Sequence, residues 1–284
     1  MNRIIVIGSS GFVGNAICNQ IFKTSSEVIT IDRNQFSKLK LSPSTFRNSV
    51  EPTDVIVFAA AKAPAKTSLD FLENMILVRE FMELIDGTSF AYLLNISSDA
   101  VYGDYLRPIV EEDFPQPTSI HGLMHYSREF LLNELFGDRM GNLRPTLIYG
   151  PRDPHNGYGP NKFIRQASNN EPIEVFGNGE EQRDHIFIED VANIAQNMIE
   201  LKYVGNINAA SGQTYSFTSI ANYVKSQFPK SQIITKSRSQ SHLPHNGYRA
   251  FNVSRLLQVV PGIKLHNITS GIDITLSSEN KNGN

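Results

Sequence analysis

The chain has 284 residues, of which 40% are hydrophobic, with 26 Lys and Arg against 28 Asp and Glu and a formal net charge of −2. This composition is typical of an ordinary globular protein with one large domain or two smaller ones. The near-neutral charge, the lack of a basic stripe and the lack of an apolar run long enough to cross a bilayer argue against nucleic acid and membrane partners.

The cysteine content and the first residues of the chain indicate where in the cell the protein is expected. Cys18 is the only cysteine, so no intramolecular disulfide can form. The first strand begins almost at Met1, so we expect no secretory leader. Together these features predict a reducing, cytoplasmic location.

The first half of the chain alternates between β-like and α-like segments. Strands are expected at 4–7, 28–31, 55–58, 92–96 and 142–147, and helices near 12–22, 69–85 and 120–136. This alternation predicts an α/β fold, a Rossmann-like doubly wound parallel sheet with helices on both faces. Ligands of such sheets bind beyond the carboxyl ends of the strands. The residues expected to gather there are Gly8, Ala59, Ala60, Ala61, Ser97, Ser98, Pro145 and Thr146.

A glycine-rich segment, Gly8-Ser-Ser-Gly-Phe-Val-Gly14, joins the first strand to the first helix. Glycines here permit a tight turn, let backbone N–H groups approach a pyrophosphate and allow the helix to lie close to the strand. Asp32 follows the second strand, where a carboxylate accepts hydrogen bonds from an adenosine ribose. The spacing alone also fits an ordinary turn, but its context predicts a dinucleotide. The loop residues expected at the dinucleotide are Gly8, Ser10, Gly11, Phe12, Val13 and Gly14.

From Gly150 to Pro160 the chain is rich in glycine and proline, which indicates a domain boundary. We expect a dinucleotide-binding Rossmann domain over residues 1–157, to which residues 184–211 return. Residues 158–183 and 212–284 are expected to form a smaller C-terminal lid domain that binds the substrate. Within these segments, strands are expected at 173–176 and 206–210, and helices at 188–201 and 219–228.

Further motifs follow in order along the chain. They are Phe58-Ala59-Ala60-Ala61, Asn74 in the next helix, the segments 97–103 and 143–152, Gly177 to Asp184, and Asn252 to Arg255. With the glycine-rich loop and Asp32, they resemble the extended short-chain dehydrogenase/reductase family, in its nucleotide-sugar epimerase, dehydratase and reductase branch. The resemblance spans nearly the whole chain.

The resemblance implies an NAD(P)-dependent nucleotide-sugar epimerase or 4-ketoreductase, in which hydride is exchanged with a sugar ring carbon. It implies that Ser98 binds the reacting sugar oxygen next to Asp99, and that Arg183 and Arg249 hold the substrate diphosphate. A guanidinium fork matches phosphate oxygens in geometry and charge. In the competing interpretation, Ser98 caps a turn and Arg183 pairs with a nearby acid, Asp184 or Glu189. The further coenzyme contacts implied are Ala59, Ala60, Ala61, Asn74, His125 and Pro145.

The chain departs from the family at its Tyr-x-x-x-Lys motif. The aligned positions, fixed by the proline-rich motif ending at Ser119 and by Glu129, hold His121 and His125. Residues four apart lie on one helix face, so both rings can point into the site. Histidine exchanges protons near neutral pH, so we expect His121 to move the proton and His125 to position the nicotinamide ring or ribose.

Other interpretations of the histidine pair stay open. The two rings could bind a metal, but no third ligand is identifiable from the spacing, so we expect no metal site. They could serve packing alone, in a catalytically inactive dinucleotide-binding regulatory or scaffold protein. Ser98 with His121 and an acid could suggest a hydrolase, but the Gly-x-Ser-x-Gly elbow of such enzymes is missing.

Ala100 narrows the reaction class. The family's dehydratases and decarboxylases resemble this segment but carry a glutamate base at the position of Ala100, and an alanine cannot take a proton. Reduction of a keto sugar, or epimerisation through a transient keto sugar, therefore remains.

Residues 32 and 33 bear on the choice of coenzyme. Asp32 repels a 2′-phosphate and favours NAD, whereas Arg33 beside it leaves NADP possible. By the resemblance we also expect a homodimer, formed through the helices at 69–85 and 120–136.

Overall fold

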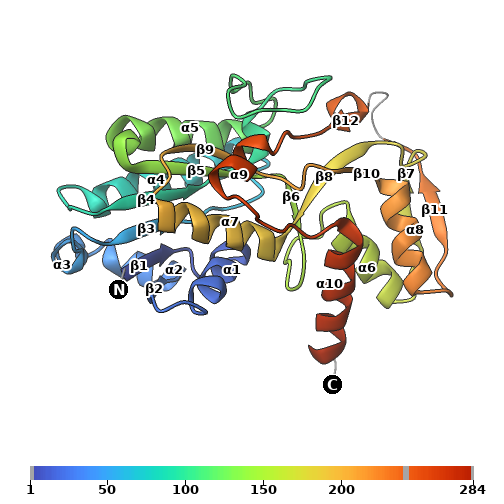
Figure 1. Ribbon diagram of the computed structural model, residues 1–284, viewed down its shortest axis with the longest axis horizontal. Coiled ribbons are helices and arrows are strands. Elements are labelled where there is room, and N and C mark those ends of the chain that lie inside the picture. Colours follow the sequence, from blue (N-terminus) through green and yellow to red (C-terminus); the bar gives the residue numbers. More distant parts are fainter. Residues whose placement is uncertain (1–2, 239–242, 283–284) are drawn as a thin grey trace. The chain divides into compact units, whose positions relative to one another are not determined.

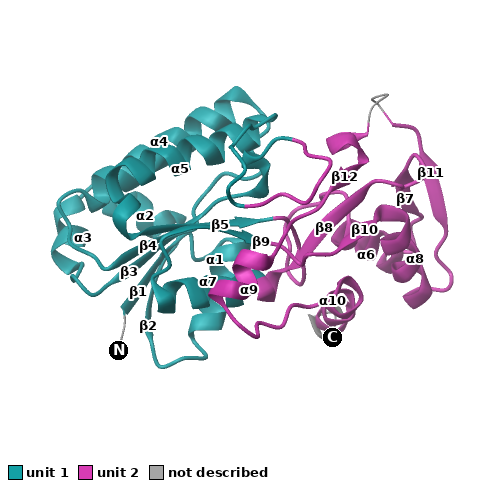
Figure 2. Ribbon diagram, turned by 45° about the horizontal axis from the view of Figure 1, so that its top comes forward, with its two compact units in different colours: residues 1–103, 111–145, 191–208 teal, residues 104–110, 146–190, 209–284 magenta. Residues whose placement is uncertain are grey.

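The computed structural model describes residues 3–238 and 243–282. It divides into two compact units (Figure 2). Unit 1 comprises residues 1–103, 111–145 and 191–208, and unit 2 comprises residues 104–110, 146–190 and 209–284. The domain boundaries expected from the sequence stay a prediction, and the two units are described separately below.

Unit 1 is built on a six-stranded sheet of order β2-β1-β3-β4-β5-β9. The strands are β1 (Arg3–Ile7), β2 (Glu27–Ile31), β3 (Val55–Phe58), β4 (Tyr92–Ile96), β5 (Met140–Pro145) and β9 (Gly205–Ala209). Pairing is parallel from β2 to β5, with Ile5 opposite both Ile29 and Ile56. Continuous apolar runs such as Val55–Phe58 are what strands buried on both faces require.

Helices flank both faces of this sheet, α4 and α5 on one side and α1 and α7 on the other (Figure 1). The helices are α1 (Phe12–Ile21), α2 (Arg33–Leu39), α3 (Pro43–Ser49), α4 (Ser68–Ile85), α5 (Ile120–Phe136) and α7 (Ile188–Leu201), with the 3-10 turns η1 (Asp99–Val101) and η2 (Gly137–Arg139). Between sheet and helices, the rings of Phe58 and Phe81 stack with centroids 3.9 Å apart. The predicted Rossmann-like, doubly wound α/β fold is confirmed.

Local signals explain where the two long helices begin. Thr67 and Asp70 form a capping box at the start of α4, each side chain accepting a backbone N–H of the other residue. At α5 the hydroxyl of Ser119 accepts the N–H of Gly122. Such caps satisfy backbone donors that have no partner within the helix, which sets the first residue of each helix.

Unit 2 contains a four-stranded sheet, in which β10, β8 and β12 lie in order and β6 also pairs with β8, and a separate pair, β11-β7. Its strands are β6 (Leu147–Tyr149), β7 (Ile173–Phe176), β8 (Gln182–Phe187), β10 (Thr214–Ser216), β11 (Ile233–Lys236) and β12 (Tyr248–Arg249). Its helices are α6 (Pro160–Ser168), α8 (Phe217–Gln227), α9 (Ser254–Val259) and α10 (Ile268–Asn282), with the turn η3 (Pro244–Gly247). The rings of Tyr158, Phe163 and Phe217 pack together between α6 and α8.

Several details differ from the sequence-based expectation, and no individual elements were predicted for α6, β8, β10, β11, α9 and α10 of unit 2. The strand expected at 142–147 breaks after Pro145, and Leu147 begins β6, which pairs with β8 instead. The short helices α2 and α3 occupy a segment for which no element was predicted; the capping box of Asp32 and Gln35 was its available signal. Within residues 3–238 and 243–282, none of the helices combines the length and apolar character needed to cross a bilayer.

Candidate functional site

The glycine-rich loop after β1 has the backbone geometry that only glycine allows. Gly8 has φ +91°, and a Cβ there would lie 2.5 Å from the backbone N of Ala60. A Cβ on Gly14 would lie 2.2 Å from the carbonyl O of Gly8, so α1 begins in direct contact with the loop. Gly11 caps α1 without a side-chain bond, which leaves the first N–H groups of the helix facing outward from its N-terminus.

Asp32 follows β2 and is the N-cap of α2. Its Oδ1 accepts the backbone N–H of Gln35 at 2.8 Å, and the side chain of Gln35 accepts the N–H of Asp32. The carboxylate is half-buried and the neighbouring Arg33 is exposed. Asp32 therefore has a structural task, closing the start of α2, in addition to any contact with a ligand.

The exit of β3 lies against the glycine-rich loop. The N–H of Ala59 donates to the carbonyl of Ile7, and Ala59, Ala60 and Ala61 are half-buried. Asn74, 1% exposed on α4, accepts the N–H of Lys62 at 2.9 Å and donates to its carbonyl at 3.0 Å. The amide of Asn74 thus fixes the loop that leaves β3.

Ser98 follows β4 and caps the turn η1. Its Oγ accepts the N–H of Ala100 at 3.1 Å, and its hydroxyl faces Oδ1 of Asp99 at 3.5 Å. A Cβ on Gly122 would lie 2.0 Å from the carbonyl O of Ala100, so α5 meets η1 in backbone contact. This contact places the start of α5, with His121, against the segment that carries Ser98 and Asp99.

The two histidines of α5 lie ring against ring. Their centroids are 4.6 Å apart, with the planes at 86°. His121 is half-buried, and its Nδ1 accepts the backbone N–H of Ala65 at 3.4 Å. His125 is 5% exposed, and its buried Nδ1 has no hydrogen-bond partner. Burial, then His121 and Arg128, lower the pKa of His125 well below its ordinary value, so this ring is neutral at pH 7.

In unit 2 the two arginines expected to hold a diphosphate are neighbours. Arg183 of β8 and Arg249 of β12 are register partners in a parallel pair, so their side chains leave the same face of the sheet. Arg183 pairs with Glu181 at 2.9 Å, not with Asp184 or Glu189 as the competing interpretation supposed. Arg249, 2% exposed, lies 3.3 Å from Asp104.

Pro145, the last residue of β5, is buried at the carboxyl end of that strand. In the part of the chain that the structure describes, no three His, Cys, Asp or Glu side chains are arranged to hold a metal ion.

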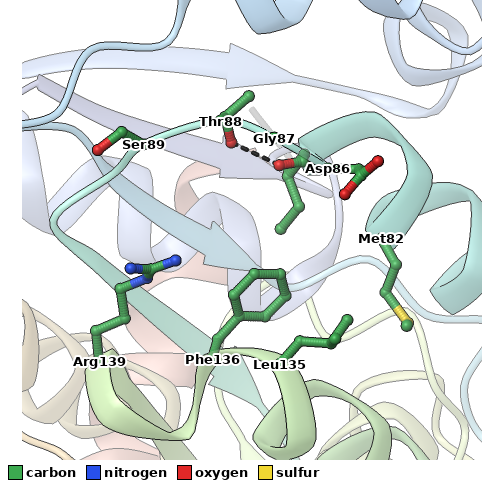
Figure 3. A pocket seen from close by; sticks show the side chains of 9 residues that line it. Met82, Asp86, Gly87, Thr88, Ser89, Leu135, Phe136 and Arg139 are labelled. Carbon is green, nitrogen blue, oxygen red and sulfur yellow. Dashed lines mark hydrogen bonds between the residues drawn. The ribbon is translucent and has the colours of Figure 1, made fainter.

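A hollow of about 350 Å³ in unit 1 is not part of this site (Figure 3). It opens where α4 and α5 end, and its lining includes Met82, Asp86, Leu135, Phe136 and Arg139. These helix ends lead into the amino ends of β4 and β5, whereas Gly8, Ser98 and the histidines follow the carboxyl ends of strands or begin α5. The candidate site therefore occupies the opposite edge of the sheet.

The residues present fit a dinucleotide. Glycine at positions 8 and 14 leaves room that a Cβ would fill, and the N-terminus of α1 favours a negative diphosphate. The buried, unpartnered Nδ1 of His125 leaves a polar atom for a ligand to satisfy.

Fold and loop together define a Rossmann-like dinucleotide-binding protein. A model of the NAD dependent epimerase/dehydratase family matches residues 4–210. The chain belongs to this family, and the resemblance inferred from its motifs is confirmed.

The individual relatives are distant in sequence, but the matches extend over most of each chain. The putative UDP-glucose 4-epimerase of Methanocaldococcus jannaschii is 26% identical over an alignment of 251 positions, which covers 78% of this chain and 81% of that protein. The dTDP-4-dehydro-6-deoxyglucose reductase of Escherichia coli is 24% identical over an alignment of 271 positions, which covers 82% of this chain and 84% of that protein. The structure of the UDP-glucuronic acid 4-epimerase of Bacillus cereus, in complex with UDP-glucuronic acid and NAD, shares the fold at a TM-score of 0.83 and 20% identity, covering 98% of this chain and 99% of that chain.

Sequence reasoning missed one prominent residue of the site. Arg128, 1% exposed on α5, donates to the carbonyls of Phe58 and Ala60 and to Asn95. Its position, three residues after His125 on the same helix, was the available signal.

Proposed function

We propose that this protein is an NAD-dependent enzyme that acts on a nucleotide sugar, as an epimerase or a 4-ketoreductase. The observation that carries the proposal is the histidine pair, which occupies the helix positions of the family's Tyr and Lys with its rings 4.6 Å apart. Family membership and relatives named as nucleotide-sugar epimerases and a reductase support the same activity.

The coenzyme would be held by unit 1. The loop from Gly8 to Gly14 would receive its diphosphate, and Asp32 would accept its adenosine ribose hydroxyls. Bound NAD would supply hydride exchange with a sugar ring carbon. Asp32 favours NAD, while Arg33 keeps NADP possible.

Proton transfer falls to His121. Because Nδ1 accepts a backbone N–H from Ala65, the neutral ring carries its own proton on Nε2 and can donate it. The hydroxyl of Ser98 donates to Oδ1 of Asp99 at a distance of 3.5 Å. Ser98 can turn this hydroxyl proton toward a sugar oxygen instead. His125, neutral and with a bare Nδ1, would hold the nicotinamide ribose or ring.

Substrate binding would draw on unit 2. Arg183 and Arg249 leave one face of the sheet and offer two guanidinium groups, whose charge Glu181 and Asp104 balance in the absence of ligand. A diphosphate would replace Glu181 and Asp104 as the partner of the two guanidinium groups, because a doubly charged ligand with bidentate geometry binds guanidinium strongly.

The proposal includes a homodimer. Neighbouring helices α4 and α5 expose a set of large apolar side chains, namely Leu69, Leu72, Ile76, Leu123 and Phe130, which are 42–68% exposed. An apolar surface of this kind marks a protein contact. It also includes the reducing, cytoplasmic location expected from the lone cysteine, and Cys18 is buried.

The test is a binding experiment followed by turnover. Calorimetry measures affinity for NAD and NADP, and the loaded protein is then incubated with UDP-, GDP-, dTDP- and CDP-sugars and with their 4-keto derivatives. We expect submillimolar NAD binding and conversion of one sugar nucleotide, lost in His121→Ala. NAD binding without stabilisation by any sugar nucleotide would instead indicate a scaffold or regulatory protein, and no affinity for either coenzyme would refute the proposal.

A further inference from the structure

Arg128 is a fully buried cation with an unusual set of partners. Its Nε donates to Oδ1 of Asn95 at 2.6 Å, and its two terminal nitrogens donate to the carbonyls of Ala60, at 2.8 Å, and Phe58. The guanidinium also lies 3.8 Å from the centre of the Phe58 ring. These three hydrogen bonds all go to neutral oxygens, while the carboxylate of Glu129 partly offsets the effect of burial on the pKa of Arg128.

These contacts join three parts of the proposed coenzyme site. Arg128 belongs to α5, which carries His121 and His125, and its acceptors Phe58 and Ala60 lie at the exit of β3. The backbone N of Ala60 in turn lies where a side chain on Gly8 would project. Arg128 therefore determines how the β3 exit lies between the glycine-rich loop and the histidine helix.

The far side of Arg128 is held by a row of amides that crosses the sheet. Nδ2 of Asn95 donates to Oδ1 of Asn142 at 2.8 Å, and Nδ2 of Asn142 donates to Oδ1 of Asn206 at 3.0 Å. Asn95 and Asn142 are register partners in β4 and β5, so the row runs perpendicular to the strands. Buried polar side chains cost free energy unless each has a hydrogen-bond partner. Because Asn95 is held by Asn142, its Oδ1 has a set position, and this positions the guanidinium of Arg128 that donates to it.

Arg128 lies three residues after His125, on the same face of α5. At the position of the family's lysine, His125 brings no permanent charge. Arg128 brings one: burial lowers its pKa only to about 9, so it is cationic at pH 7. Burial first, then His121 and then Arg128, lower the pKa of His125 and so oppose a positive charge on its ring.

We propose that Arg128 supplies the permanent positive charge on the histidine helix, and that as a positioning residue it holds the β3 exit against this helix and adds to the burial that keeps His125 an uncharged hydrogen-bonding group. The lysine's charge and its hydrogen bond are then divided between two residues one turn apart. His121 remains the ring that carries a transferable proton. The role of Arg128 in the reaction rests on the proposed function, whereas its effect on the charge of His125 does not.

The first test uses the ligand-free protein. Nitrogen-15 NMR of the histidine rings follows His125 from pH 8 to pH 4 in the wild type, in Arg128→Met and in Arg128→Lys. We expect the pKa of His125 to lie well below the ordinary histidine value in the wild type, to rise in Arg128→Met, and to change little in Arg128→Lys, which keeps the charge. Tyr92→Phe is the matched control, because it removes the buried bond from Tyr92 to the carbonyl of Tyr203 at the amino end of β4.

The outcomes separate a charge effect from general loosening. A rise in Arg128→Met but not in Tyr92→Phe supports the proposal, and equal rises in both overturn it. If Arg128→Met fails to fold, the wild type and Arg128→Lys decide: His125 titrating near pH 6.5 in the wild type, or shifted upward in Arg128→Lys, overturns the proposal.

The second test concerns the reaction. Once a substrate is found for the wild type, Arg128→Lys should lower kcat by about 100-fold with little change in KM for the sugar nucleotide. The positive charge is kept, but the paired hydrogen bonds to the carbonyls of Phe58 and Ala60 are lost. An unchanged kcat would remove the positioning role. If the wild type binds no coenzyme at all, the proposed function fails while the titration still decides the relationship between Arg128 and His125.

Discussion

The backbone N–H of Ala65 donates to Nδ1 of His121, joining the loop that follows β3 to the first turn of α5. Ala65 is buried, so water does not compete for this bond. The bond assigns the proton of the neutral ring to Nε2, which gives the two histidines of α5 different chemistry although they share a helix face.

His121→Ala is expected to lower kcat by 10²- to 10⁴-fold, roughly the range for loss of a general acid or base, without weakening NAD binding. Steady-state kinetics and calorimetry measure the two effects. Asn133→Ala, at an exposed position of the same helix, serves as the control and should leave both unchanged. Equal activity of His121→Ala and the wild type would exclude His121 as the proton carrier.

Asp32→Ala is expected to weaken NAD more than NADP, because the carboxylate accepts the ribose hydroxyls of the first and repels the phosphate of the second. It also removes the cap of α2, at a cost of about 1 kcal/mol in the free energy of unfolding. Asp32→Asn separates the two effects, since asparagine caps a helix equally well but carries no charge. Calorimetry with each coenzyme shows the difference; equal losses for NAD and NADP in Asp32→Asn would remove the basis for preferring NAD.

Gly14→Ala is expected to abolish measurable coenzyme binding and to destabilise unit 1 by about 1–3 kcal/mol, because the new Cβ meets the carbonyl of Gly8 at 2.2 Å. Gly157→Ala is a suitable control, since nothing lies within 4 Å of the added Cβ. Urea unfolding and coenzyme titration measure both variants. Normal NAD affinity in Gly14→Ala would show that the loop is not the diphosphate cradle.

His185 of β8 is expected to make the protein less stable in acid. Burial, reinforced by Arg183, lowers its pKa to about 3, and its Nε2 has no hydrogen-bond partner. Between pH 6.5 and pH 3 the unfolded chain therefore binds more protons, so stability falls as pH falls, by at most about 1.4 kcal/mol per pH unit from this one ring. His185→Phe and His185→Gln should both flatten the acid side of the urea-midpoint profile. A profile as steep as that of the wild type in both variants would contradict this role.

Phe130→Glu is expected to convert a homodimer to monomers, since it places a charge within the apolar set of α4 and α5. Leu201→Glu tests a leucine of similar exposure, 57% against 62% for Phe130, at the end of α7 on the other face of the sheet, and should leave the dimer intact. Sedimentation velocity distinguishes the two states. A monomeric wild type would contradict the predicted dimer itself.

Periodic apolar patterns predicted most of the fold because they depend on neighbours in the chain. The range 120–136 was expected as a helix and is one, and the same holds for strand 173–176. The prediction failed at 142–147, because Pro145 cannot donate to a sheet ladder, so β5 ends there and Leu147 begins β6, which pairs with β8.

The candidate site shows the same division. The order of residues determined the glycine-rich loop, the acid after β2 and the spacing of His121 and His125, because each depends on a local turn or on one helix face. Only the tertiary structure decided what surrounds them: that Ala65 reaches His121, that Arg183 stands beside Arg249, and that Arg128 takes its acceptors from two strands. Hydrogen bonds and burial between segments far apart in the chain leave no periodic trace in it, yet they set the charge and the tautomer on which the proposed chemistry depends.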